Sequence, residues 1–173
     1  IGIAQTLLMF LAMWWVWIYT AWALNWLDPE RNRGRLLVFV LMAAALVLSM
    51  SIEAAWSERG LTFAIAYVSI QVGRSLFMVA ALRPHRPGTY RSFVRITTWL
   101  AVAGAFWIAG GLSEGGSRMG LWLTALAIEY VAAPLNFWMP VLGRSSTTDW
   151  DIEGGHMAER AGLFIIIALG ESI

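Results

Sequence analysis

The chain is dominated by long apolar runs, each long enough to cross a lipid bilayer. Of its 173 residues, 59% are hydrophobic and 13% are charged, whereas a soluble domain holds about 45–50% apolar and about 25% charged residues. A helix needs roughly 20 apolar residues to cross a bilayer. The runs of that length are 3–27, 35–56, 61–82, 93–112 and 119–139, and a sixth begins near 157 and is cut at 173.

These runs predict an all-α, multi-pass transmembrane helix bundle with five complete spans and the start of a sixth. We expect one membrane domain over 1–173 with the lipid bilayer as its surroundings. The chain starts without a methionine and stops within an apolar run, so we expect it to be a piece of a longer membrane protein.

The composition excludes several classes of site. There is no cysteine, and all twelve basic residues are arginine, so this chain offers no thiolate ligand and no lysine Schiff base. Both histidines, His85 and His156, lie outside the apolar runs, which argues against a haem held between helices. A net charge of +1 argues against a nucleic-acid surface. The sequence predicts no cofactor, no metal and no nucleic-acid partner.

Arginines alternate between the loops, which predicts the orientation. Loops 28–35, 83–92 and 140–156, with the residues just beyond them, hold most of the arginines that lie outside the apolar runs, whereas the other two loops hold Arg59 and Arg118. Cytoplasmic loops carry an excess of Arg and Lys. We therefore expect these three loops in the cytoplasm and Ile1 outside.

Three charged residues fall deep inside the runs: Arg74, Glu129 and Glu171. A charge at mid-bilayer costs at least about 2.5–3.5 kcal/mol, so such groups normally face a partner or water. Gln71 and Arg74 share a face of the third run with Tyr67, and Glu129 and Asn136 are seven residues apart on the fifth. We expect the two stripes to face each other.

This arrangement has two interpretations. One is an ion pair between Arg74 and Glu129 that fixes helix packing. The other is a polar cavity that carries a proton, an ion or a small polar solute. Two carboxylates, Glu129 and Glu171, against one arginine predict an excess of negative charge, and hence a bound proton or cation.

The entrance to the sixth run carries a second candidate site. His156, Glu159 and Arg160 lie at its cytoplasmic mouth, after Asp149, Asp151 and Glu153. An alternative function is therefore a membrane enzyme for lipid or prenyl substrates at this face, although the acids lack a repeated Asp-x-x-Asp spacing. A metal held by His156 and its acidic neighbours is a weaker interpretation than a hydrated helix cap. A third alternative is a membrane scaffold or sensor without a site.

Other patterns concern packing. Trp15, Tyr19, Trp22 and Trp26 form one aromatic face of the first run; packing or an interfacial belt is the first interpretation, and a stacked isoprenoid, carotenoid or flavin is the alternative. Ala101, Ala105 and Ala109 form a stripe of small residues that favours close helix packing, within the chain or in an oligomer. Pro134 is expected to kink the fifth run.

An ordered set of segments resembles the bacterial low temperature requirement A (LtrA) family. They are residues 14–17 (WWVW), 25–31 (NWLDPER), 66–67 (AY), 70–74 (IQVGR) and 150–173. The resemblance implies a bacterial plasma-membrane protein linked to growth in the cold, with no established catalytic residues. Together with the residue pattern, it favours a non-enzymatic protein whose activity is transport or ion and proton handling through a polar site around Arg74, Glu129 and Glu171.

Overall fold

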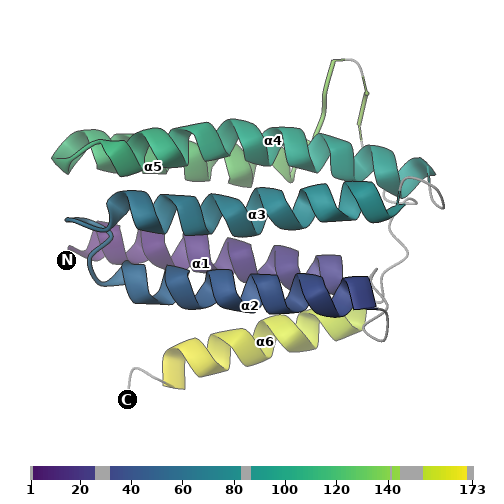
Figure 1. Ribbon diagram of the computed structural model, residues 1–173, viewed down its shortest axis with the longest axis horizontal. Coiled ribbons are helices and arrows are strands. Elements are labelled where there is room, and N and C mark those ends of the chain that lie inside the picture. The colour runs from purple at the N-terminus through teal and green to yellow at the C-terminus, as the bar shows by residue number, and fades with distance from the viewer. Residues whose placement is uncertain (1, 26–31, 83–86, 141, 145–153, 171–173) are drawn as a thin grey trace.

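In the computed structural model, the apolar runs form helices that lie side by side (Figure 1). The structure describes residues 2–25, 32–82, 87–140, 142–144 and 154–170, and in the last range the side chains of 159, 161–167 and 170. These residues contain six helices: α1 (Ile3–Leu24), α2 (Asn32–Ile52), α3 (Gly60–Leu82), α4 (Pro87–Leu112), α5 (Gly115–Ala132) and α6 (Gly154–Gly170). The fold of the described part of the chain is all-α.

Four of the described helices, α1 to α4, are long and apolar enough to cross a membrane. Helices α5 and α6 are shorter, with 18 and 17 residues. The predicted helical class is therefore confirmed, whereas the predicted count of five complete spans is not.

The largest difference from the predicted boundaries lies in the fifth run. Helix α5 ends at Ala132, seven residues before the predicted limit of 139. Pro134 has no N–H to continue the helical hydrogen bonds, and Asn136 and Phe137 then adopt left-handed φ angles of 51° and 50°. That region costs an L-residue roughly 1–2 kcal/mol. The expected kink is instead the end of the helix.

Helix α4 begins earlier than expected, at Pro87 rather than near 93. Proline suits the first turn of a helix because its missing N–H has no helical partner there. The added turns carry Thr89 and Ser92, which are buried. Polar residues counted as loop thus belong to a helix face that packs inside the bundle.

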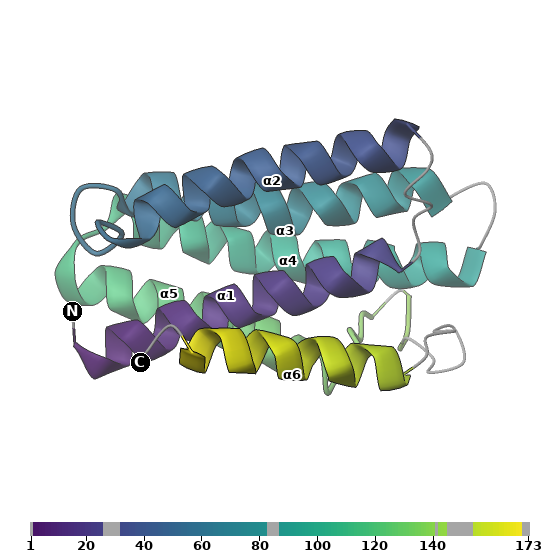
Figure 2. The same cartoon turned by 90° about the horizontal axis from the view of Figure 1, so that it is seen from below.

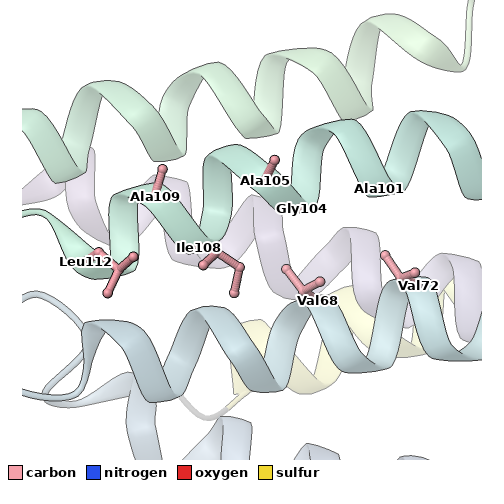
Figure 3. Close-up of a pocket in the computed structure, with 8 residues that line it drawn as sticks. All are labelled: Val68, Val72, Ala101, Gly104, Ala105, Ile108, Ala109 and Leu112. Atoms are coloured by element: carbon pink, nitrogen blue, oxygen red, sulfur yellow. The ribbon is translucent and has the colours of Figure 1, made fainter.

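Helices α3 and α4 cross closely because glycine lies at the contact. A Cβ added at Gly111 would lie 2.9 Å from the Cβ of Ala64 and 3.0 Å from the carbonyl oxygen of Gly60. The predicted stripe of small residues lies elsewhere: its alanines are exposed in this chain. They line an apolar groove of about 540 Å³ together with Val68 and Val72 (Figure 3).

Helix α6 lies along α1 at the edge of the bundle (Figure 2). The ring of Phe164 is centred 5.3 Å from that of Trp14 and 5.0 Å from that of Trp17. The expected aromatic face of α1 points the other way, with Trp15 and Tyr19 buried in the bundle. Its fourth member, Trp26, lies outside the described residues.

Candidate functional site

Glu129 of α5 is the one buried carboxylate among the described residues, with 2% of its surface exposed. Two side chains donate hydrogen bonds to it. The Tyr67 hydroxyl of α3 donates to Oε2 at 2.6 Å, and Trp107 Nε1 of α4 donates to Oε1 at 3.2 Å. Both donors are fully buried. The carboxylate is therefore held by neutral groups from two other helices.

Arg74 of α3 is also buried, and it forms hydrogen bonds with a different set of residues from those around Glu129. Its Nη1 donates to Thr20 Oγ1 at 2.7 Å and, at 3.4 Å, to the carbonyl oxygen of Val16, both on α1. Its Nη2 donates to Gln71 Oε1 at 2.5 Å. The guanidinium also lies over the Tyr19 ring, 5.6 Å from its centre. These contacts bind α3 to α1.

Gln71 connects the two charged residues. Its Nε2 donates to the Tyr67 hydroxyl at 3.4 Å. Thr20, Arg74, Gln71, Tyr67, Glu129 and Trp107 thus form one chain of hydrogen bonds across four helices, named below the Glu129–Arg74 network. Among the described residues, no hydrogen bond or ion pair joins Arg74 to Glu129 directly. The expected stripes do approach each other, but through intermediates rather than as a contact pair.

The network lies near the middle of α3. A Cβ added at Gly60 would lie 2.6 Å from Arg118 Cζ, so these two residues share one level at the end of the bundle. Gln71 follows Gly60 by eleven residues and Glu129 follows Arg118 by eleven. At 1.5 Å per residue, both lie about 16 Å along parallel helices. Helix α3 is about 34 Å long by the same measure, so the network sits at mid-depth.

Arg118 closes the end of the bundle where α3 begins. It is 4% exposed and donates to the carbonyl oxygens of Ala55, Ser57, Gly110 and Ser113 at 2.8 to 3.3 Å. Carbonyl groups near helix ends lack helical donors and need such partners. Arg118, expected in a loop, is thus a buried arginine that ties two inter-helix turns together.

Aromatic rings fill the space between Arg118 and Glu129. Phe63, Trp107 and Trp122 are fully buried, with ring centres 5.2 to 6.0 Å apart. Trp122 Nε1 donates to the carbonyl oxygen of Trp107 at 3.0 Å, which holds the Glu129 donor in place. This aromatic plug separates the network from that end of the bundle.

The structure separates the other predicted site residues from this cluster. Asn136 follows the end of α5 and its side chain is exposed, so it does not share a stripe with Glu129. The expected stripe assumed a helix that Pro134 does not permit. Glu171 lies outside the described residues, as do the side chains of His156 and Arg160 and the acids at 149, 151 and 153. Glu159 is exposed on α6.

The sequence predicts more buried carboxylates than arginines, and the described residues show the reverse. In the described part of the chain, three arginines are buried, Arg74, Arg95 and Arg118, against the single carboxylate Glu129. Nothing in the sequence pattern singles out Thr20 or Trp107, because an uncharged polar group within an apolar run carries no periodic signal. No three histidine, aspartate or glutamate side chains in the described ranges come together as a metal site would require.

The described residues thus combine four helices of membrane-spanning length and composition, α1 to α4, with a buried polar network, features of an integral membrane protein. The chain belongs to the bacterial low temperature requirement A (LtrA) family, whose model matches residues 1–173. An uncharacterized protein of Rhizobium meliloti (strain 1021) is 45% identical over 174 residues, which cover 100% of this chain and 42% of the relative. The chain thus spans about two-fifths of that curated relative. No solved structure matches it.

Proposed function

We propose that this protein handles protons within the membrane, with Glu129 as the group that binds and releases the proton. The proposed role is transport or proton-linked signalling without enzymatic chemistry. The observation that carries it is the way in which the Glu129 carboxylate is held. Its hydrogen-bond donors are the neutral side chains of Tyr67 and Trp107. Arg74 is separated from the carboxylate by two hydrogen-bonded side chains, those of Tyr67 and Gln71.

A carboxylate in direct contact with an arginine gains a proton only by breaking that ion pair, and breaking a buried pair is strongly destabilising. Glu129 has no such partner within the described residues. A proton on Oε1 or Oε2 would change only its hydrogen bonds with a hydroxyl and an indole. Protonation at this position is therefore compatible with the packing of the helices around it.

The network also provides a means by which the protonation state can affect other helices. The hydrogen bonds run from Glu129 through Tyr67 and Gln71 to Arg74, and from there to Thr20 on α1. Hydrogen bonds in such chains polarise one another. A change of charge at Glu129 would therefore alter how firmly Arg74 holds α1. This coupling suits a protein that moves a helix when a proton binds.

The packing favours a proton over a larger cargo. Tyr67 and Trp107 are fully buried and Glu129 is 2% exposed, so a solute has no room beside the carboxylate in this conformation. The family's description refers to a requirement at low temperature. We propose that proton handling by Glu129 is the activity on which growth in the cold depends.

The test is proton flux with the full-length protein in liposomes, driven by a potassium diffusion potential and followed with a trapped pH-sensitive dye. Wild type is expected to conduct protons, and Glu129→Gln is expected to reduce flux to the level of empty liposomes. Glu53→Gln is the matched control, because Glu53 is exposed, and it should retain wild-type flux. Thermal unfolding in detergent is measured for all three.

Two results would contradict the proposal. One is wild-type protein that conducts no protons under any driving force. The other is Glu129→Gln protein that conducts as wild type does. If flux is absent and Glu129→Gln unfolds at a clearly lower temperature, Glu129 is a packing element.

A further inference from the structure

We infer that Phe137 is a gate through which water reaches the Glu129–Arg74 network from the side of the bundle where α5 stops. This inference deepens the proposed function, since it names the route by which a proton arrives at Glu129. It stands on the burial, backbone conformation and contacts of the segment after α5, named here the 133–140 strap.

The network needs water in order to exchange a proton. An arginine guanidinium only donates hydrogen bonds and keeps its protons in proteins. Arg74 therefore interrupts any proton relay that runs along the network. Glu129 exchanges a proton only if water comes to it or to Tyr67, from one end of the bundle or the other.

The end that holds Arg118 is firmly closed. Phe63, Trp107 and Trp122 fill the interior there, and Arg118 is fixed by four backbone carbonyl groups. A Cβ added at Gly110 would overlap with Trp122 Cδ1, so the backbone of α4 packs directly against this ring. Opening this end requires several bonds and a stack of rings to separate together.

The other end is closed by the strap and by a separate buried cluster of Ala23, Met78, Leu82 and Phe93. Helix α5 stops three residues after Glu129, and the strap continues in its place. Pro134, Leu135 and Asn136 are exposed, whereas Phe137 is 9% exposed. The Phe137 ring is centred 6.3 Å from that of Tyr19, which in turn lies under the Arg74 guanidinium. Phe137 is therefore the side chain of the strap that reaches the residues around the network.

The backbone of the strap is strained at Phe137. Phe137 has a φ of 50°, in a region that is unusual for a bulky side chain. Such strain persists only where the surroundings impose it, and it gathers at switch regions. Beyond Phe137, the strap is held to α4 by Trp99 Nε1, which donates to the carbonyl oxygen of Trp138 at 3.2 Å. Release of the strap would relieve the strain and withdraw the ring.

The buried cluster that contains Phe137 also contains a hydrogen-bond donor that a water molecule could pair with. Trp15 Nε1 is buried and has no hydrogen-bond partner among the described residues. Trp15 belongs to the same buried cluster as Phe137, Tyr19, Ile96 and Leu100. An unpaired buried donor calls for an explanation, and a water that enters past Phe137 would accept its hydrogen bond.

The test measures thiol access rather than flux, in the full-length protein with any native cysteines replaced. Leu100→Cys places a thiol in the cluster beneath Phe137, and Ala125→Cys places one beside the aromatic plug. Both positions are buried. Labelling by a charged, water-soluble thiol reagent is followed in detergent. We expect the thiol at position 100 to react slowly and the thiol at position 125 not to react.

Two changes to the strap separate a gate from a simple cavity. Asn136→Ala keeps the Phe137 ring but disfavours the left-handed turn that seats it, so the thiol at position 100 should react roughly fivefold faster. Phe137→Ala removes the ring and should accelerate the reaction further. Leu135→Ala is the matched control, since that side chain is exposed on the same strap, and should leave the rate unchanged. None of these changes should expose the thiol at position 125.

Equal labelling rates at position 100 with the native strap, with Asn136→Ala and with Phe137→Ala would overturn the gate. Acceleration by Phe137→Ala alone would also overturn it, because that result describes a cavity rather than a strained closure. These outcomes are independent of proton flux. A gate that opens as expected in a protein without flux would leave this inference standing and remove the proposed function.

Discussion

At the scale of single residues, Tyr67 is the side chain on which the network depends. Its hydroxyl donates to Glu129 and accepts from Gln71, so it joins the charged residue of α5 to the polar stripe of α3. A carboxylate that loses one of two donors while buried keeps the cost of its burial without the compensating bond.

We therefore expect Tyr67→Phe to destabilise the protein by about 2 kcal/mol and to lower its Tm by roughly 4–8 °C. Thermal unfolding in detergent measures the change. Tyr90→Phe serves as the control because Tyr90 is half-buried and away from the network, and its Tm should match wild type. Equal unfolding temperatures for the two variants would mean that Tyr67 contributes ring packing only.

At the scale of elements, the arrangement of α4 and α5 determines how Glu129 is held. Helix α5 brings the carboxylate to mid-depth, and α4 supplies the Trp107 donor. Trp122 of α5 fixes the backbone of Trp107 and packs against Gly110 of α4. The close approach at Gly110 thus sets the position of the ring that holds Glu129.

Gly110→Ala is expected to cost about 1–3 kcal/mol, the usual penalty for overpacking. The added Cβ would overlap with Trp122 Cδ1 and force that ring away. Gly120→Ala on α5 is the matched control. Nothing lies within 4 Å of its added Cβ, and alanine favours a helix by about 0.5–1 kcal/mol over glycine. The two variants should shift Tm in opposite directions, and a shift in the same direction would contradict this view of the contact.

The α3 stripe could be predicted from the sequence, whereas the α5 stripe could not. Tyr67, Gln71 and Arg74 recur at helical spacing in an unbroken helix, and the structure buries all three. Asn136 follows Glu129 at the same kind of spacing, but Pro134 lies between them and the helix ends first. Periodicity gives a face only while the helix continues.

The partners of the charged groups were beyond sequence reasoning for a different reason. Spacing places Arg74 and Glu129 at similar depth, but it does not say whether an arginine or a tyrosine from the same face reaches the carboxylate. Arg118 follows a glycine-rich break and has the appearance of a loop residue. It is buried because the turns at that end leave four carbonyl groups for it to bind.

At the scale of the whole molecule, the helices divide into those that build the network and those that do not. The network uses α1, α3, α4 and α5, whereas α2 exposes many large apolar side chains, among them Leu36, Phe39 and Met50. Such a surface suits contact with lipid. The exposed arginines gather at one end of this bundle, namely Arg33, Arg35, Arg91 and Arg144, with Arg59 at the other.

This asymmetry predicts the orientation of the protein in the cell. Because cytoplasmic loops carry the excess of arginine, the end where the 133–140 strap lies should face the cytoplasm and the Arg118 end should face outward. The 173 residues contain no cysteine, which allows single thiols to report the sides. Glu58→Cys and Gly88→Cys place exposed thiols at the Arg118 end and at the arginine-rich end.

A membrane-impermeant reagent added to intact cells should label the thiol at position 58 at once and the thiol at position 88 only after the membrane is permeabilised. The reverse pattern would place the strap outside, and the proton exchange proposed for Glu129 would then take place with the cell exterior rather than with the cytoplasm. Equal labelling of both thiols in intact cells would mean that the arginines do not orient this bundle. In the expected orientation, the Phe137 ring and the cluster of Met78, Leu82 and Phe93 lie on the cytoplasmic side of the Glu129–Arg74 network, and the aromatic plug lies on its outer side.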